Sequence, residues 1–296
     1  MSTTTTETAV APRLAPHEEI KTMKLYHHVD RIERRLRELD DDSDNNAAHG
    51  DAIDPEVLAR VDSLHFLGDE PVRHIEQLLG DSRHKTVLDV GTGYGGTARL
   101  LAHRSGCHVH ALELQPELFA AGRELTRRCG LDDRVTHELG DFLALPETPQ
   151  QYDVVVGLLC FLHIGRWHQL FQKCHDSLGS GGFLFVEDFF VRGDELPEQD
   201  TTALRDEVYC ASLLRRPELL AALARCGFRR VEFRDRTQEW TPFVVQRAEA
   251  YRAKLAEHIQ RDGEETARGL DHFYATVAGL FQGGNVGGYT LVAWKD

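Results

Sequence analysis

A glycine-rich segment between two apolar runs has the composition of a ligand-binding turn. It reads VLDVGTGYGG over residues 87–96 and leads into an amphipathic run. Glycines let the backbone approach a ligand closely, and the N-terminus of a following helix offers unpaired N–H groups. Glu113 ends the next apolar run, about 20 residues after Gly91, where a carboxylate can accept hydrogen bonds from both hydroxyls of a ribose. This pattern predicts a site for a nucleoside-containing ligand.

The glycine spacing alone leaves two classes of ligand open. Gly91-x-Gly93-x-x-Gly96 fits the dinucleotide-binding fingerprint when that fingerprint is read loosely, so an NAD(P)-dependent oxidoreductase stays an alternative. Two further features accompany the turn. Asp89 stands two residues before the first glycine, and the sequence Gly-Asp-Phe follows the third predicted strand at residues 140–142. Together with Glu113 they form one set of motifs in chain order.

Short apolar runs alternate with amphipathic runs from about residue 70 to the end of the chain. They predict strands over 86–90, 109–113, 135–138, 152–156, 183–187, 230–236 and 289–293, and helices over 70–79, 97–103, 116–129, 166–178 and 217–226. We therefore predict an α/β fold with a doubly wound, mostly parallel, seven-stranded Rossmann-like sheet. Segments 191–215 and 237–285 lie outside the alternation and are expected to form a lid over the carboxyl ends of the strands.

The chain is expected to divide into three parts. Residues 1–50 form an N-terminal extension, with a mobile start over 1–16, a helix over 17–39 and an acidic linker after it. Residues 51–190 form the Rossmann-like core together with N-terminal helices that cover the substrate. Residues 191–296 contain the lid insertions and the remaining core strands.

The motifs around Asp89, Glu113 and Asp141 resemble those of class I S-adenosylmethionine-dependent methyltransferases, and the resemblance covers about residues 62–296. It implies that S-adenosyl-L-methionine is the cofactor and S-adenosyl-L-homocysteine the product. It also implies that Glu113 binds the ribose diol and that Asp141 and Phe142 meet the adenine. The cofactor-binding residues implied in this way are Asp89, Gly91, Thr92, Gly93, Glu113, Leu114, Asp141, Phe142 and Leu158.

The segment after the fourth predicted strand narrows the resemblance. Residues 157–164 (GLLCFLHI) and 170–174 (LFQKC) resemble the phosphoethanolamine and the sarcosine/dimethylglycine N-methyltransferases. His163 then matches a catalytic histidine of that group, and a base that titrates near neutrality suits an amine that must be neutral to attack. The expected reaction is in-line methyl transfer to nitrogen with His163 as the base. Transfer to the sulfur of a small thioether or thiol, or to carbon, stays an alternative.

Acceptor-binding residues are expected in the covering segment and in the lid. Residues 62–68 (DSLHFLG) resemble the segment that those enzymes place over the substrate. Aromatic rings can hold a cationic product and arginines can bind an anion. The acceptor-binding residues predicted on these grounds are His65, Phe66, Tyr209, Arg215 and Trp240, and Phe243, Arg205 and Arg216 are further candidates.

Two departures from the phosphoethanolamine pattern affect the expected acceptor. Leu159 stands where those enzymes carry an acid, and the loop over 281–288 has no Lys or Arg where they carry a basic residue. A phosphate dianion needs such a cation close by. The sequence therefore favours a glycine-, sarcosine- or dimethylglycine-like amine, and a phosphoethanolamine-like amine stays an alternative.

The composition limits the partners and the compartment. The 296 residues carry 34 Lys and Arg against 48 Asp and Glu, and the net charge of −14 argues against nucleic acid and against an anionic membrane surface. Six scattered cysteines predict reduced thiols, and the first residues predict no secretory signal. We expect a cytoplasmic monomer or homodimer that acts on a small molecule and binds no metal.

Overall fold

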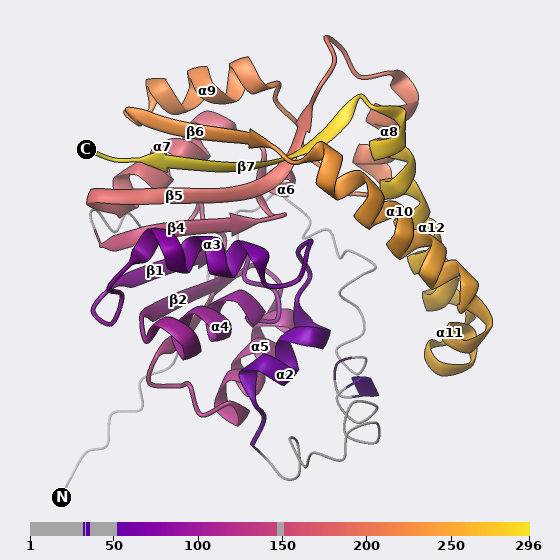
Figure 1. The fold of residues 1–296 in the computed structure, drawn as a ribbon, viewed down its shortest axis with the longest axis horizontal. Coiled ribbons are helices and arrows are strands. Elements are labelled where there is room, and N and C mark those ends of the chain that lie inside the picture. The colour runs from indigo at the N-terminus through magenta and orange to yellow at the C-terminus, as the bar shows by residue number, and fades with distance from the viewer. Residues whose placement is uncertain (1–31, 33, 36–51, 147–150) are drawn as a thin grey trace, which may run out of the picture.

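The computed structural model describes residues 32, 34–35, 52–146 and 151–296 (Figure 1). The predicted mobile start and acidic linker lie outside these residues. Within the helix predicted over 17–39, the three residues that the structure describes are helical.

A seven-stranded sheet forms the centre of the molecule, in the order β3-β2-β1-β4-β5-β7-β6 (Figure 1). The strands are β1 (Thr86–Val90), β2 (His108–Glu113), β3 (Val135–Leu139), β4 (Tyr152–Leu158), β5 (Leu178–Val191), β6 (Arg230–Asp235) and β7 (Val286–Trp294). All neighbours are parallel except β7, which runs antiparallel to β5 and β6. This topology confirms the predicted doubly wound fold.

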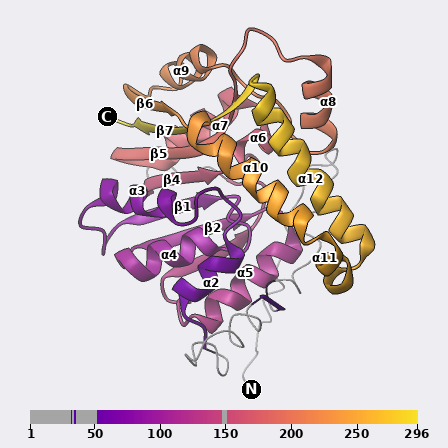
Figure 2. The ribbon, with the colours of Figure 1, turned by 45° about the vertical axis from the view of Figure 1, so that its right-hand side comes forward.

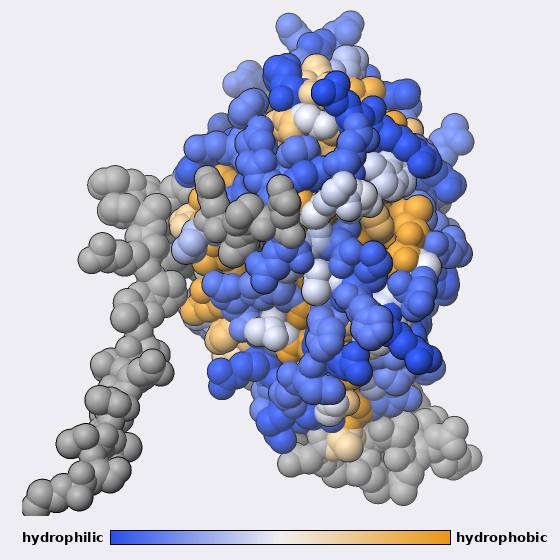
Figure 3. All heavy atoms as spheres, turned by 90° about the vertical axis from the view of Figure 1, so that its left-hand side faces the viewer, coloured by the Kyte–Doolittle hydropathy of each residue, from blue (hydrophilic) through white to orange (hydrophobic). Residues whose placement is uncertain are grey.

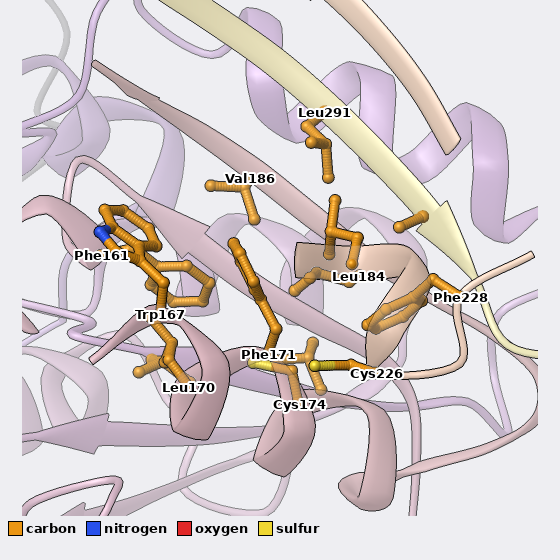
Figure 4. Close-up of a cluster of buried hydrophobic side chains, with 14 of the residues drawn as sticks. Phe161, Trp167, Leu170, Phe171, Cys174, Leu184, Val186, Cys226, Phe228 and Leu291 are labelled. Atoms are coloured by element: carbon orange, nitrogen blue, oxygen red, sulfur yellow. The ribbon is translucent and has the colours of Figure 1, made fainter. Parts of the chain in front are cut away.

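Helices cover both faces of the sheet because its strands are apolar on both sides. The helices of the core are α2 (Pro55–Asp62), α3 (Glu70–Leu79), α4 (Gly96–Ser105), α5 (Pro116–Arg128), α6 (Phe161–Ile164), α7 (Trp167–Ser177) and α9 (Arg216–Arg225). On one face, Val154 and Phe185 pack against α3 and α4. On the other face, Leu184 and Val186 meet the buried side chains of α7 and α9 (Figure 4). Burial on both faces explains the near-continuous apolar runs in the sequence.

The predicted ends of helices and strands agree with the structure where nearby residues determine them, and differ where pairing with a distant strand determines them. The helix predicted over 70–79 has those bounds, and the other core helices end within a few residues of their predicted ends. The strand predicted over 183–187 was too short. β5 begins at Leu178 and includes the glycine-rich segment 179–182, because Leu178 already pairs with Tyr152 of β4, with a register shift between the strands.

Four helices extend past the carboxyl ends of the parallel strands. They are α8 (Glu198–Asp206), α10 (Thr237–Ala253), α11 (Leu255–Asp262) and α12 (Glu264–Gly283). Figures 1 and 2 show α10 and α12 running side by side at this end of the sheet, with α11 joining them. These helices come from the two segments that were expected to form a lid.

The surface at the opposite end of the sheet is mainly hydrophilic, with hydrophobic side chains interspersed (Figure 3). Throughout the part of the chain that the structure describes, no helix combines the length and the hydrophobicity needed to cross a membrane.

The join between the lid and the sheet depends on one glycine. A Cβ atom at Gly288 of β7 would overlap the ring of Trp240 in α10, which is fully buried. We expect Gly288→Ala to lower the free energy of unfolding by about 3 kcal/mol, because neither the strand nor the indole has room to move. Gly279→Ala is the control, since this exposed position in α12 has no atom within 4 Å of its added Cβ. The free energy of unfolding of Gly279→Ala should rise by about 0.5–1 kcal/mol. Equal urea midpoints for Gly288→Ala and the unaltered protein would contradict the packing.

Candidate active site

A cavity of about 790 Å³ opens at the carboxyl ends of β1, β2 and β4. Its wall is formed by the glycine-rich turn, the ends of these strands and the segment after β3. All nine residues predicted to bind the cofactor line it, namely Asp89, Gly91, Thr92, Gly93, Glu113, Leu114, Asp141, Phe142 and Leu158. The structure therefore brings together residues that lie up to about 70 positions apart in the chain.

The glycine-rich turn is held against the sheet edge. The backbone N–H groups of Gly91 and Thr92 both donate to the carbonyl of Leu112, at 2.9 and 3.0 Å. Gly91 has a φ of 71°, and a Cβ atom there would overlap the sulfur of Cys160. This position therefore requires glycine both for its backbone conformation and for the close approach of the segment after β4.

Glu113 is a buried carboxylate at the end of β2. It accepts hydrogen bonds from the backbone N–H groups of Gly93, at 2.8 Å, and Gln115, at 2.9 Å. Burial raises its pKa to about 7, since the described residues provide no cationic partner to compensate the desolvation of the charge. Asp89 is also buried, and its carboxylate accepts from the Thr92 hydroxyl, at 2.6 Å, with a pKa raised to about 6 by burial.

S-adenosylmethionine fits this cavity on the chemistry of its lining. The Glu113 carboxylate is incompletely compensated, and a ribose diol would supply two further donors to it. Asp141 holds the turn after β3 by accepting from the Leu143 N–H, at 2.8 Å, and the adjacent Phe142 presents an aromatic ring. The volume lies in the range of about 300–1,000 Å³ that is typical of sites for small ligands.

A second cavity, of about 430 Å³, lies beside the first and under the lid. Its wall includes side chains from α10 and α12. The two cavities share a stretch of wall made by Ser63, Leu64, His65, Leu159 and His163. Groups bound in the two cavities would therefore both lie against these residues.

His163 lies on α6 at this shared wall. Its Nδ1 is 3.1 Å from the carbonyl oxygen of Tyr209, and because a carbonyl only accepts, Nδ1 must carry the proton. In the neutral ring Nε2 then keeps its lone pair. Burial lowers the pKa of His163, so the ring is neutral at pH 7. The start of α6 is anchored by Asp188 of β5, whose carboxylate accepts from the Leu162 N–H, at 2.9 Å.

Known proteins with similar sequences are methyltransferases, which agrees with a cavity that fits S-adenosylmethionine. A family described as a methyltransferase domain matches residues 87–182, which include the glycine-rich turn, Glu113, Asp141 and His163. The sarcosine/dimethylglycine N-methyltransferase of Halorhodospira halochloris is 27% identical over 216 residues, which are 70% of this chain and 77% of that protein. Residues 87–182 therefore form an S-adenosylmethionine-dependent methyltransferase domain.

Other relatives of this methyltransferase are longer than the chain. The glycine/sarcosine/dimethylglycine N-methyltransferase of Actinopolyspora halophila is 30% identical over 75% of this chain but only 39% of its own length. The solved structure of phosphoethanolamine N-methyltransferase 2 from Haemonchus contortus, with phosphomonomethylethanolamine and S-adenosylhomocysteine, superposes with a TM-score of 0.70 and 20% identity. It covers 77% of this chain, which spans about half of that protein. At this identity the superposition supports the fold.

Three of the five predicted acceptor-binding residues line the cavities of the methyltransferase. His65 lines both cavities, and neither of its ring nitrogens has a hydrogen-bond partner among the described residues. Burial lowers its pKa to about 4, so it is neutral. Phe66 lines the second cavity and Tyr209 the first.

Arg215 and Trp240 line neither cavity, so the cavities do not support their predicted role. Arg215 pairs with Glu218 at the exposed start of α9, at 2.6 Å. Trp240 is buried behind Phe66, with ring centroids 4.9 Å apart. The other two arginines considered as anion partners also lie elsewhere. Arg205 pairs with its neighbour Asp206 on the surface, and Arg216 lies over the ring of Phe233.

Sequence reasoning missed Arg247 of α10, which lines the second cavity. The available signal was its spacing of four residues from Phe243, which places both on one side of a helix. The structure also describes no group of three or more His, Cys, Asp or Glu side chains, within the residues it covers, that could hold a metal ion.

Four residues around the shared wall have left-handed backbone conformations without being glycine. They are Leu67, Leu159, Arg166 and Tyr209, with φ values of 58°, 51°, 44° and 57°. Leu159 and Arg166 flank α6, and Tyr209 supplies the carbonyl that holds His163. Such conformations cost about 1 kcal/mol or more each and persist only where the surroundings enforce them.

Proposed function

We propose that this methyltransferase transfers a methyl group to the nitrogen of an amine bound in the second cavity, with His163 as the base. The observation that carries the proposal is the position of His163 on the wall that the two cavities share. The names of the relatives, sarcosine/dimethylglycine and phosphoethanolamine N-methyltransferases, support nitrogen as the methylated atom.

The chemistry asks for one proton acceptor at this wall. When bound, S-adenosylmethionine supplies an electrophilic methyl group. The acceptor nitrogen must lose a proton, either before it attacks the methyl group or as it does so. Nε2 of His163 can accept this proton, because the Tyr209 carbonyl keeps the other ring proton on Nδ1. The remaining contribution of the protein is to hold the reactants in line. The shared wall also contributes two aliphatic side chains, Leu159 and Leu64.

A transfer assay with a labelled methyl donor tests this function. Amines, amino acids, thiols and thioethers are offered in parallel, and the expected product is an N-methylated amine. Products methylated only on sulfur or on carbon would contradict the proposal. Calorimetry with S-adenosylmethionine and with NAD(P) separates the oxidoreductase alternative, since we expect heat of binding with the first and none with the second.

We further propose that the enzyme acts on small molecules and not on nucleic acid, in the cytoplasm, as a monomer or homodimer. The net charge of −14 supports the exclusion of a polyanionic partner.

A further inference from the structure

Arg247 projects from α10 into the second cavity and is surrounded by aromatic rings. The guanidinium carbon lies 4.8 Å from the ring centre of Phe66, 4.8 Å from that of Tyr274 and 5.4 Å from that of Phe243. Three rings from the covering segment, α10 and α12 therefore hold this cation in place.

No carboxylate compensates this cation within the described part of the chain. Arg247 forms no ion pair there, its Nε atom is buried without an acceptor, and the residues lining the second cavity include no Asp or Glu. Other arginines of the lid are paired, as Arg252 is with Asp271 at 2.9 Å and Arg268 with Glu264 at 2.9 Å. In a chain with a net charge of −14, a cavity whose described lining has two arginines, Arg35 and Arg247, and no acid departs from the general composition.

A buried guanidinium with unused donors is costly unless an anion reaches it. Cation–π contacts recover part of that cost but leave the N–H donors unsatisfied. We propose that the methyl acceptor carries an anionic group, a carboxylate or a phosphate, that Arg247 binds in the second cavity. The proposal rests on the proposed N-methylation and adds the class of acceptor.

The size and lining of the second cavity indicate a second property of the acceptor. Its 430 Å³ suits a ligand much larger than glycine or sarcosine. Most lining side chains other than Arg247 are aliphatic or aromatic, including Val61, Leu162, Phe189 and Val277. The acceptor therefore has an apolar body between its amine and its anionic group.

Activity measured on a series of acceptors of increasing length tests both the anionic group and the apolar body. ω-Amino alkanoates from glycine to 8-aminooctanoate are compared with alkylamines of equal length, in the unaltered enzyme and in Arg247→Met, Arg247→Lys and Arg252→Met. We expect kcat/KM to rise with length in the acids. Arg247→Met should lower it by about 30-fold for the long acids and leave the alkylamines unchanged, Arg247→Lys should retain part of the preference, and Arg252→Met should have no effect. A maximum at glycine or sarcosine, or an equal loss for acids and alkylamines in Arg247→Met, would overturn the proposal.

A binding experiment separates this proposal from the methyl transfer itself. Octanoate, octyl phosphate and octanol are titrated calorimetrically into the enzyme with S-adenosylhomocysteine present. We expect at least one anion to bind, its affinity to fall about 30-fold in Arg247→Met, and octanol to be indifferent to the variant. The anion with the larger loss identifies the head group. The proposal is overturned if neither anion binds to the unaltered enzyme. It is also overturned if the anions bind Arg247→Met as tightly as the unaltered enzyme and the two proteins have the same melting temperature. Arg247-dependent anion binding without methylation of any amine overturns the N-methylation alone.

Discussion

Replacing His163 by alanine is expected to lower kcat/KM for an amine acceptor by about 10³-fold at pH 7. The loss follows because the variant lacks the His163 imidazole, and the other histidine at the shared wall, His65, is a much weaker base with a pKa lowered to about 4 by burial. His168→Ala is the control, since His168 is an exposed histidine on α7 and does not line either cavity. Initial rates at saturating S-adenosylmethionine give both values.

The pH dependence distinguishes a base from a residue that only shapes the site. Burial lowers the pKa of His163 below its usual value of 6.5, so the neutral ring is already the main form at pH 6.5. The unaltered enzyme should lose activity as the pH falls through the lowered pKa of His163 and the ring becomes protonated. The alanine variant should depend on free amine from solution, so its rate should rise steadily toward the pKa of the acceptor. The rate of the unaltered enzyme divided by that of the alanine variant should therefore fall as pH rises. A constant ratio from pH 6 to 10 would contradict the assignment of His163 as the base.

Replacing Glu113 by glutamine should have opposite effects on cofactor binding and on stability. The affinity for S-adenosylmethionine is expected to fall about 10²-fold, because two hydrogen bonds from the ribose diol to a charged acceptor are weakened. Without the cofactor, the variant should be more stable than the unaltered protein at pH 7. Burial raises the pKa of Glu113 from 4.5 to about 7, so its charged form is costly in the folded state.

The sign of the stability effect is set by which state releases the proton first. As pH rises from about 4.5 to 7, the unfolded state loses the Glu113 proton before the folded state does, so the unaltered protein loses stability relative to Glu113→Gln. The difference should reach about 3 kcal/mol at pH 7 and above and vanish below pH 4.5. Urea unfolding at several pH values and calorimetry with the cofactor measure both effects. Glu117→Gln, at an exposed position of α5, should change neither quantity. Loss of affinity without the pH-dependent gain would indicate general damage to the site.

The cofactor half of the site was predictable from the sequence because its signals are local. Gly91 and Glu113 each follow an apolar run, and parallel strands bring their carboxyl ends to one edge. The strand bounds failed at β5, where a cross-strand pairing through Leu178 overrides the glycine signal.

The acceptor half was less predictable because it depends on packing between distant segments. Trp240 and Arg247 lie two turns apart on α10, yet one fills the core above Gly288 and the other faces the cavity. Which of them meets the acceptor is decided by how α10 lies against β7 and α12. No pattern within α10 records that arrangement.

The left-handed conformations of Leu159, Arg166 and Tyr209 imply a conflict between robustness and catalysis in this enzyme. Glycine at any of these positions would relax the backbone, so selection for thermal tolerance alone would favour it. The same change would free the short helix that carries His163 and the carbonyl that fixes its tautomer. Laboratory evolution for heat resistance should therefore enrich glycine at these positions when turnover is not selected, and should retain the larger side chains when it is.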